Sequence, residues 1–263
     1  MTQPFFFGES NKRLFAFYHP PQKQCSGKAI LLCYPVGQEY LRVYRSYRLL
    51  ASRLSANGAH VLRFDYFGTG DSSGTNEQSE LKHWLNDIDL AIEQLKSKSG
   101  LSRVSIVGLR LGATLAAKAC TERNDIDHLI CWEPVVDGKI YIDDLQTTHA
   151  AMLKDPDRFY KARTAEECES NELIGFLFSD KLLAEIKTID KTDLLNAYCD
   201  SFNLINASNN DGIRSLSTHR LVNSSEIQYN QFETDLCWSD INQIETTFAP
   251  QEIIGHITKK LTK

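Results

Sequence analysis

One five-residue stretch, Gly108-Leu109-Arg110-Leu111-Gly112, has the outline of a serine nucleophile motif but holds an arginine at its centre. It follows an apolar run and precedes a stretch of small residues, which predicts a buried strand, a sharp turn and a helix. That is the setting of the G-x-S-x-G nucleophile elbow. A guanidinium stays protonated and only donates hydrogen bonds, so Arg110 cannot attack a carbonyl carbon. The motif therefore predicts a nucleophile position without a nucleophile.

The elements that would position this turn form a largely parallel sheet with helices on both faces, because apolar runs alternate with helical patterns. After an opening hairpin at 5–7 and 14–18, strands are expected at 29–34, 60–64, 104–107, 129–132, 202–205 and 227–232. Helices are expected at 40–54, at 81–95 with Gly100 as the stop, after the elbow, and at 250–261.

The alternation of predicted strands and helices is interrupted between Trp132 and Phe202, where several helical patterns occur without a clear strand. The run 173–178 could be read as a strand, but the apolar residues that follow it favour a helical excursion. Long insertions are more often functional than idle. We therefore expect a core of residues 1–137 and 197–263 and a helical lid or cap insertion of residues 138–196.

Three stretches together resemble the α/β-hydrolase superfamily in its serine aminopeptidase-like branch. They are the elbow, Tyr34-Pro35-Val36-Gly37, and the D-x-x-G-x-G-x-S-x-G pattern of residues 65–74. With Trp132-Glu133-Pro134-Val135-Val136-Asp137-Gly138 added, the set is similar to the exosortase-system-associated hydrolases of bacteria. The resemblance implies an α/β-hydrolase fold from about residue 29 to the final helix. It also implies an oxyanion hole made by the backbone N–H groups of Leu111 and of Val36 or Gly37.

The same resemblance places a catalytic acid after the strand at 202–205 and a histidine after the last strand. Asp211 stands near the first position, although Asn-Asp-Gly also suits a tight turn, which is the favoured interpretation. No histidine occurs at 232–239, where Trp238 stands instead; His219 precedes the last strand and His256 lies in the final helix. Loss of nucleophile or base removes roughly a millionfold of rate in the best-studied serine hydrolase, so ordinary serine hydrolysis is not expected.

Arg110 can be interpreted in two ways. A cation beside a helix N-terminus suits a carboxylate or phosphate ligand. A buried charge also needs pairing, and Glu133 or Asp211 could supply it inside the protein. The candidate ligand-binding residues are Arg110, Leu111, Val36, Gly37, Glu133 and Trp238.

Three function hypotheses follow. The first is a pseudo-hydrolase, or a catalytically reassigned protein, that binds a small anionic or acyl ligand. The second is an active ester or thioester hydrolase or acyltransferase with a non-standard nucleophile. Cys237 and Ser72 are its candidates, although Cys237 has no visible base and Ser72 fits best in the glycine-rich turn, while Cys33 is expected in the core. The third is an interaction or structural protein whose pocket an Arg110 ion pair closes.

The composition limits the classes of partner and cofactor expected for this chain. A formal net charge of −5 does not favour nucleic-acid binding, and no apolar stretch approaches the ~20 residues of a membrane span. Seven scattered cysteines without a C-x-x-C pair indicate a reduced, cytoplasmic protein. Histidine spacing predicts no metal, and no cofactor is expected. Arg42, Arg45 and Arg48 are expected on a solvated helix face. Oligomeric state is left open.

Overall fold

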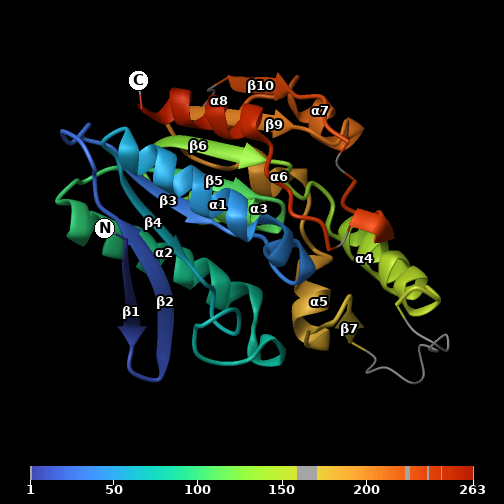
Figure 1. Cartoon of the computed structure of the whole chain (residues 1–263). Helices are drawn as coiled ribbons and strands as arrows, with labels where there is room; N and C mark the ends of the chain where they lie inside the picture. The colour runs from blue at the N-terminus through green and yellow to red at the C-terminus, as the bar shows by residue number, and fades with distance from the viewer. Residues whose placement is uncertain (1, 159–170, 223–225, 236, 244, 263) are drawn as a thin grey trace.

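The structure, a computed structural model, describes residues 2–158, 171–222, 226–235, 237–243 and 245–262. Its centre is an eight-stranded sheet in the order β1-β2-β4-β3-β5-β6-β9-β10 (Figure 1). The strands are β1 (Gln3–Glu9), β2 (Lys12–His19), β3 (Ala29–Cys33), β4 (His60–Phe64), β5 (Val104–Leu109), β6 (Ile126–Trp132), β9 (Ser201–Asn206) and β10 (Ile227–Gln231). From β4 to β10 neighbouring strands are parallel, whereas β1 and β2 form an antiparallel hairpin at one edge.

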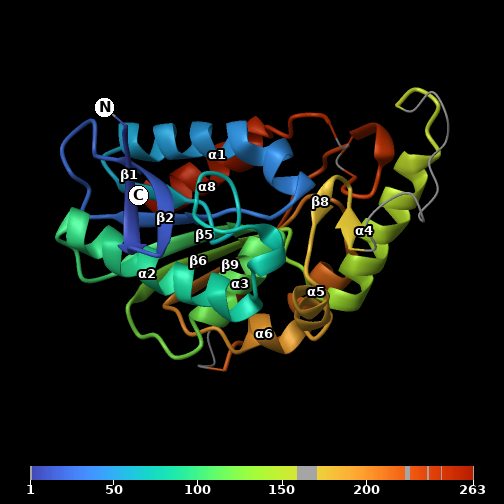
Figure 2. The same ribbon diagram turned by 90° about the horizontal axis from the view of Figure 1, so that it is seen from below.

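Helices cover both faces of this sheet (Figure 2). On one face lie α1 (Gln38–Ala56) and α8 (Gln251–Thr262); on the other lie α2 (Leu81–Ser99) and α3 (Leu111–Ala119). Strands β3 and β5 are buried along their whole length, which explains their unbroken apolar sequences. The predicted α/β architecture is therefore confirmed. The predicted stop of α2 is also observed, since Gly100 caps it in the left-handed conformation with φ 71°.

The segment between β6 and β9 contains α4 (Gly138–Leu153), β7 (Glu172–Leu173), β8 (Phe176–Leu177), α5 (Asp180–Ile186) and α6 (Lys191–Leu195). Helices α4 and α5 and the small hairpin gather at the end of the molecule where the parallel strands finish (Figure 2). Residues 159–170 of this segment lie outside the described residues. The remaining short elements are η1 (Asn76–Gln78), α7 (Asp211–Leu216) and η3 (Ile241–Gln243).

One prediction for this segment is wrong: most of the run 173–178 belongs to an antiparallel hairpin of residues 172–177 rather than to a helical excursion. The turn residues Ile174 and Gly175 have φ values of 49° and 83°. Positive φ at both central residues is the requirement of the two-residue turn that joins hairpin strands. The helix begins only at Asp180, where the Ser179 hydroxyl accepts the Leu182 N–H and caps it.

Candidate functional site

The backbone at Arg110 keeps the sharp turn of a nucleophile elbow. Arg110 joins β5 to α3 with φ 53° and ψ −127°, a conformation that side-chain-bearing residues rarely adopt and that costs about 1–3 kcal/mol. The flanking glycines make the turn possible: a Cβ on Gly108 would collide with Ala113, and one on Gly112 would collide with the carbonyl oxygen of Tyr34. The elbow is thus built as its motif predicts, with arginine at its tip.

The Arg110 side chain is held by a buried ion pair. Its Nε donates a hydrogen bond to Oε1 of Glu39 at 2.8 Å, and the two side chains are only 10% and 6% exposed. The hydroxyl of Tyr141 donates to the other oxygen of Glu39 at 3.1 Å. Burial alone would lower the pKa of Arg110, but Glu39 and Tyr141 outweigh it and raise the pKa. The guanidinium is therefore charged at every physiological pH.

Both carboxylates that we expected as partners of Arg110 have other roles, so that expectation is wrong. Glu133 is fully buried, and its carboxylate accepts hydrogen bonds from the Ala207 and Ser208 N–H groups and from the Ser208 hydroxyl, which ties the end of β6 to the end of β9. Asp211 is the first residue of α7; its side chain is 90% exposed and pairs with Arg214.

Arg110 also borders open space. Its terminal nitrogens, Nη1 and Nη2, have no hydrogen-bond partner among the described residues, and Arg110 lines a cavity of about 140 Å³. The other lining residues are Pro134, Val135, Val136, Asp137, Ile140, Tyr141, Asp144, Asn210 and Gly212. The cavity resembles in size an apolar cavity of about 150 Å³ that accommodates benzene. It therefore has room for a ligand of a few heavy atoms.

Two carboxylates line this cavity, those of Asp137 and Asp144, and they have different surroundings. Asp137 accepts the N–H groups of Lys139 and Ile140 and so caps α4. Asp144 lies one to two turns along the same helix, and burial raises its pKa although Arg110 acts in the opposite direction. Asp144 is thus the acidic side chain that would compete with, or repel, an anionic ligand.

Trp238 completes the surroundings of the elbow. It comes from the loop after β10, where the resemblance placed a catalytic histidine, and its side chain is buried. The guanidinium carbons of Arg110 and Arg42 lie 5.0 and 4.9 Å from the centre of its ring. Such cation–aromatic contacts are favourable, the more so when desolvated. The loop therefore places an aromatic side chain beside Arg110, at the position where a catalytic histidine was expected.

The predicted solvated arginine face of α1 is wrong for Arg42. Arg45 and Arg48 are exposed, whereas Arg42 is buried and donates to the Cys237 carbonyl and to the Gln243 side chain. Burial lowers the pKa of Arg42. The loop that covers this side chain is some two hundred residues away in sequence, which is why the spacing of the arginines alone could not reveal it.

Of the expected oxyanion donors, Val36 and Gly37 line a different cavity from Arg110, and Leu111 is among the lining residues of neither cavity. Gly37, with φ 60°, caps α1, and Leu111 is the buried first residue of α3; neither N–H has an acceptor among the described residues. Val36 and Gly37 line a cavity of about 280 Å³ together with Tyr40 and Phe176. A Cβ on Gly37 would lie 3.2 Å from the Phe178 ring. The structure therefore does not bring these donors and Arg110 into one pocket.

The alternative nucleophiles differ sharply in their surroundings. Burial raises the pKa of Cys33 to about 12, so its thiol is not ionised. The Ser72 hydroxyl donates to the Asp65 carbonyl and accepts the Phe15 N–H, which makes it part of the glycine-rich turn. Cys237 is exposed, and the hydrogen bonds found for it involve its backbone.

The described residues also bear on two other kinds of site, a metal centre and a membrane span. There, no cluster of three or more histidine, cysteine or carboxylate side chains is arranged to hold a metal ion. None of the helices within the described ranges has the length and apolarity needed to cross a membrane.

Comparison with known proteins identifies the fold family. The family model described as serine aminopeptidase, S33 matches residues 39–194. Est1E from Butyrivibrio proteoclasticus, solved with bound ferulic acid, is 15% identical with a TM-score of 0.67, over 98% of this chain and 96% of that one. A carboxyl esterase from Bacillus coagulans is 12% identical with a TM-score of 0.66, over 100% and 99%.

The bottromycin epimerase BotH, solved with bottromycin A2, is 13% identical with a TM-score of 0.58, over 99% of both chains. No curated protein matches this chain. At these identities the solved structures establish the fold alone, and the S33 match establishes the family. The chain therefore belongs to the serine aminopeptidase S33 family and has the α/β-hydrolase fold.

Proposed function

We propose that this protein is a pseudo-hydrolase that binds a small carboxylate, such as a short-chain acyl acid, at Arg110. The observation that carries the proposal is the pair of unpartnered terminal nitrogens of a charged, buried arginine that borders a cavity. A guanidinium presents two parallel N–H donors that match the two oxygens of a carboxylate. Val135, Val136 and Ile140 line the same cavity and suit a short apolar tail.

The elbow and the loop after β10 support a binding role over serine hydrolysis. Arg110 has no nucleophilic oxygen. The side chains that pair with it or stack near it are those of Glu39, Tyr141 and Trp238, and none of them is a histidine. The fold does not decide the activity. A structure described as an epimerase shares it with one described as a carboxyl esterase.

The third hypothesis is a pocket closed by an ion pair. Arg110 does pair with Glu39, but through only one of its three guanidinium nitrogens. Nε is occupied, while Nη1 and Nη2 are not paired within the described part of the chain. We infer that the ion pair orients the guanidinium so that its outer edge faces the ligand. The insertion of residues 138–196, which supplies Tyr141 and Asp144 to this cavity, acts in this proposal as the cap.

Isothermal titration calorimetry with acetate and butyrate tests the proposal. Wild type is expected to bind butyrate more tightly than acetate, and Arg110→Gln to weaken both about tenfold or more, since charge-assisted bidentate bonds are lost. Arg45→Gln is the matched control, because it removes the same charge from an exposed position of α1. Equal affinity in wild type and Arg110→Gln would contradict the proposal, and absence of any binding by wild type would favour the closed pocket.

An assay of p-nitrophenyl butyrate hydrolysis distinguishes the proposed pseudo-hydrolase from the second hypothesis, an active hydrolase. The proposal predicts turnover at the uncatalysed rate. Turnover well above that rate which disappears in Cys237→Ala would establish the active hydrolase with a non-standard nucleophile. A gene position beside exosortase genes would support the finer resemblance carried by residues 132–138.

A further inference from the structure

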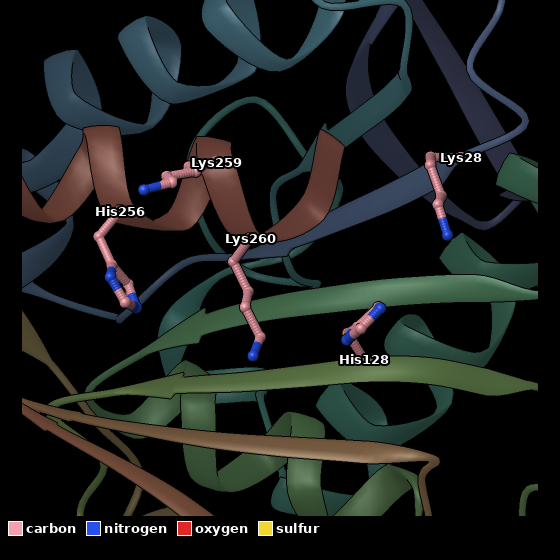
Figure 3. A pocket seen from close by; sticks show the side chains of 5 residues that line it. All are labelled: Lys28, His128, His256, Lys259 and Lys260. Atoms are coloured by element: carbon pink, nitrogen blue, oxygen red, sulfur yellow. The ribbon is translucent and has the colours of Figure 1, made fainter. Parts of the chain in front are cut away.

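A separate cavity, of about 430 Å³, is lined by five basic side chains, Lys28, His128, His256, Lys259 and Lys260 (Figure 3). Lys28 immediately precedes β3, His128 lies in β6 opposite the first residue of β9, and the other three belong to α8. The cavity therefore lies toward the amino ends of the parallel strands. The elbow lies at their carboxyl ends, so the two sites are distinct.

These side chains have no carboxylate partner at the cavity wall. No carboxylate lines the cavity, and neither the Lys28 ammonium nor the Lys259 ammonium has a hydrogen bond or ion pair with any residue that the structure describes. Lys260 donates to the neutral side chain of Gln228. Nδ1 of His128 is buried and has no hydrogen-bond partner among the described residues. In a chain of net charge −5, such a concentration of unpaired basic groups is unexpected.

The basic groups also act on one another electrostatically. His128 lies between the ends of Lys28 and Lys260 (Figure 3), and burial together with these two lysines lowers its pKa, while Asp127 and Asp200 act in the opposite direction. Burial, Lys260 and Lys259 likewise lower the pKa of His256. A bound anion would relieve this repulsion and favour the protonated histidines.

We propose that this cavity binds a small molecule through its phosphate groups. Lysine ammonium groups bind phosphate as point charges, whereas carboxylates are typically recognised by the planar fork of arginine, which is absent from this cavity. Lys28, Lys259 and Lys260 approach from two elements and can contact more than one phosphate oxygen. The imidazole rings of His128 and His256 line the same cavity.

Calorimetric titration with inorganic pyrophosphate at fixed ionic strength tests the site. Saturable binding is expected, weakened about tenfold by Lys28→Ala and by Lys260→Ala, because each removes one charge-assisted contact. Lys23→Ala is the matched control, since Lys23 is exposed and does not line the cavity. Absence of saturable binding, or equal weakening by Lys23→Ala, would overturn the proposal. Loss of binding in an Arg110→Gln variant that remains folded by circular dichroism would overturn it as well, by placing the anion at the elbow.

The histidines provide a second readout. With sulfate, whose charge is constant over this range, affinity is expected to rise as the pH falls from about 8 to about 5.5, where histidine becomes protonated. The double variant His128→Gln/His256→Gln is expected to lose that rise while still binding sulfate through the lysines. An unchanged pH dependence in this variant would contradict the assignment of the histidines to the site.

Discussion

Replacing Glu39 by glutamine removes the negative charge beside Arg110 while keeping the size of the side chain. Both partners are almost fully buried, with 6% and 10% of their side chains exposed. For charge centres about 4 Å apart at an effective dielectric constant of about 20, the attraction amounts to about 4 kcal/mol. Breaking a buried pair by removing one partner costs about 3–5 kcal/mol, since the remaining charge is left uncompensated. We expect Glu39→Gln to lower the free energy of unfolding by about 3 kcal/mol, because its amide oxygen can still accept one hydrogen bond.

Urea denaturation of a double-mutant cycle measures this coupling. Arg110→Met combined with Glu39→Gln is expected to be less destabilised than the sum of the two single variants by about 2–3 kcal/mol, as for groups in direct contact. Tyr141→Phe serves as the control for the accessory hydrogen bond and is expected to cost about 1.5 kcal/mol. A coupling energy below about 0.5 kcal/mol, the level of additive sites, would refute the ion pair as the feature that orients Arg110.

Three further predictions concern the elbow, the cavity and the core. Gly112→Ala is expected to destabilise the protein by about 3 kcal/mol or more, because the added methyl collides with Tyr34 at a backbone atom that cannot move away; an unchanged urea midpoint would contradict this. Asp144→Asn is expected to tighten butyrate binding about threefold in calorimetry, since it removes a negative charge near Arg110, and weaker binding would argue that Asp144 helps to hold the ligand. Burial raises the pKa of Asp87 to about 7. The folded state therefore keeps a proton that the unfolded state loses near pH 4, and the free energy of unfolding falls by up to about 1.4 kcal/mol per pH unit between about pH 4 and pH 7. Asp87→Asn removes this decline, and an equal slope in both proteins would show that another group titrates.

The fold was predictable because its main signals are local. The buried strand at 29–33 is one unbroken apolar run, and the glycines of the elbow are required by contacts within a few residues or with the neighbouring strand. The hairpin at 172–177 was missed because an apolar run of this length fits either a strand or a helix. The deciding signal was Gly175, which permits the positive φ of a hairpin turn.

The partner of Arg110 could not be read from spacing, since Glu39 is 71 residues away in sequence. A signal for it nevertheless exists in α1. Glu39 and Arg42 fall on the same helical stripe as Val43, Tyr47 and Leu50, all of which are buried. Charged residues on an apolar stripe indicate burial and hence pairing, whereas the three-residue spacing of the arginines alone suggested a solvated face.

A crystal structure of the protein grown with butyrate would test the central claim most directly. We expect the carboxylate to accept hydrogen bonds from Nη1 and Nη2 of Arg110 inside the cavity lined by Val136 and Tyr141, with Nε still bonded to Glu39. A structure in which Asp144 occupies those terminal nitrogens, and butyrate binds elsewhere or not at all, would contradict the assignment of Arg110 as a ligand-binding residue.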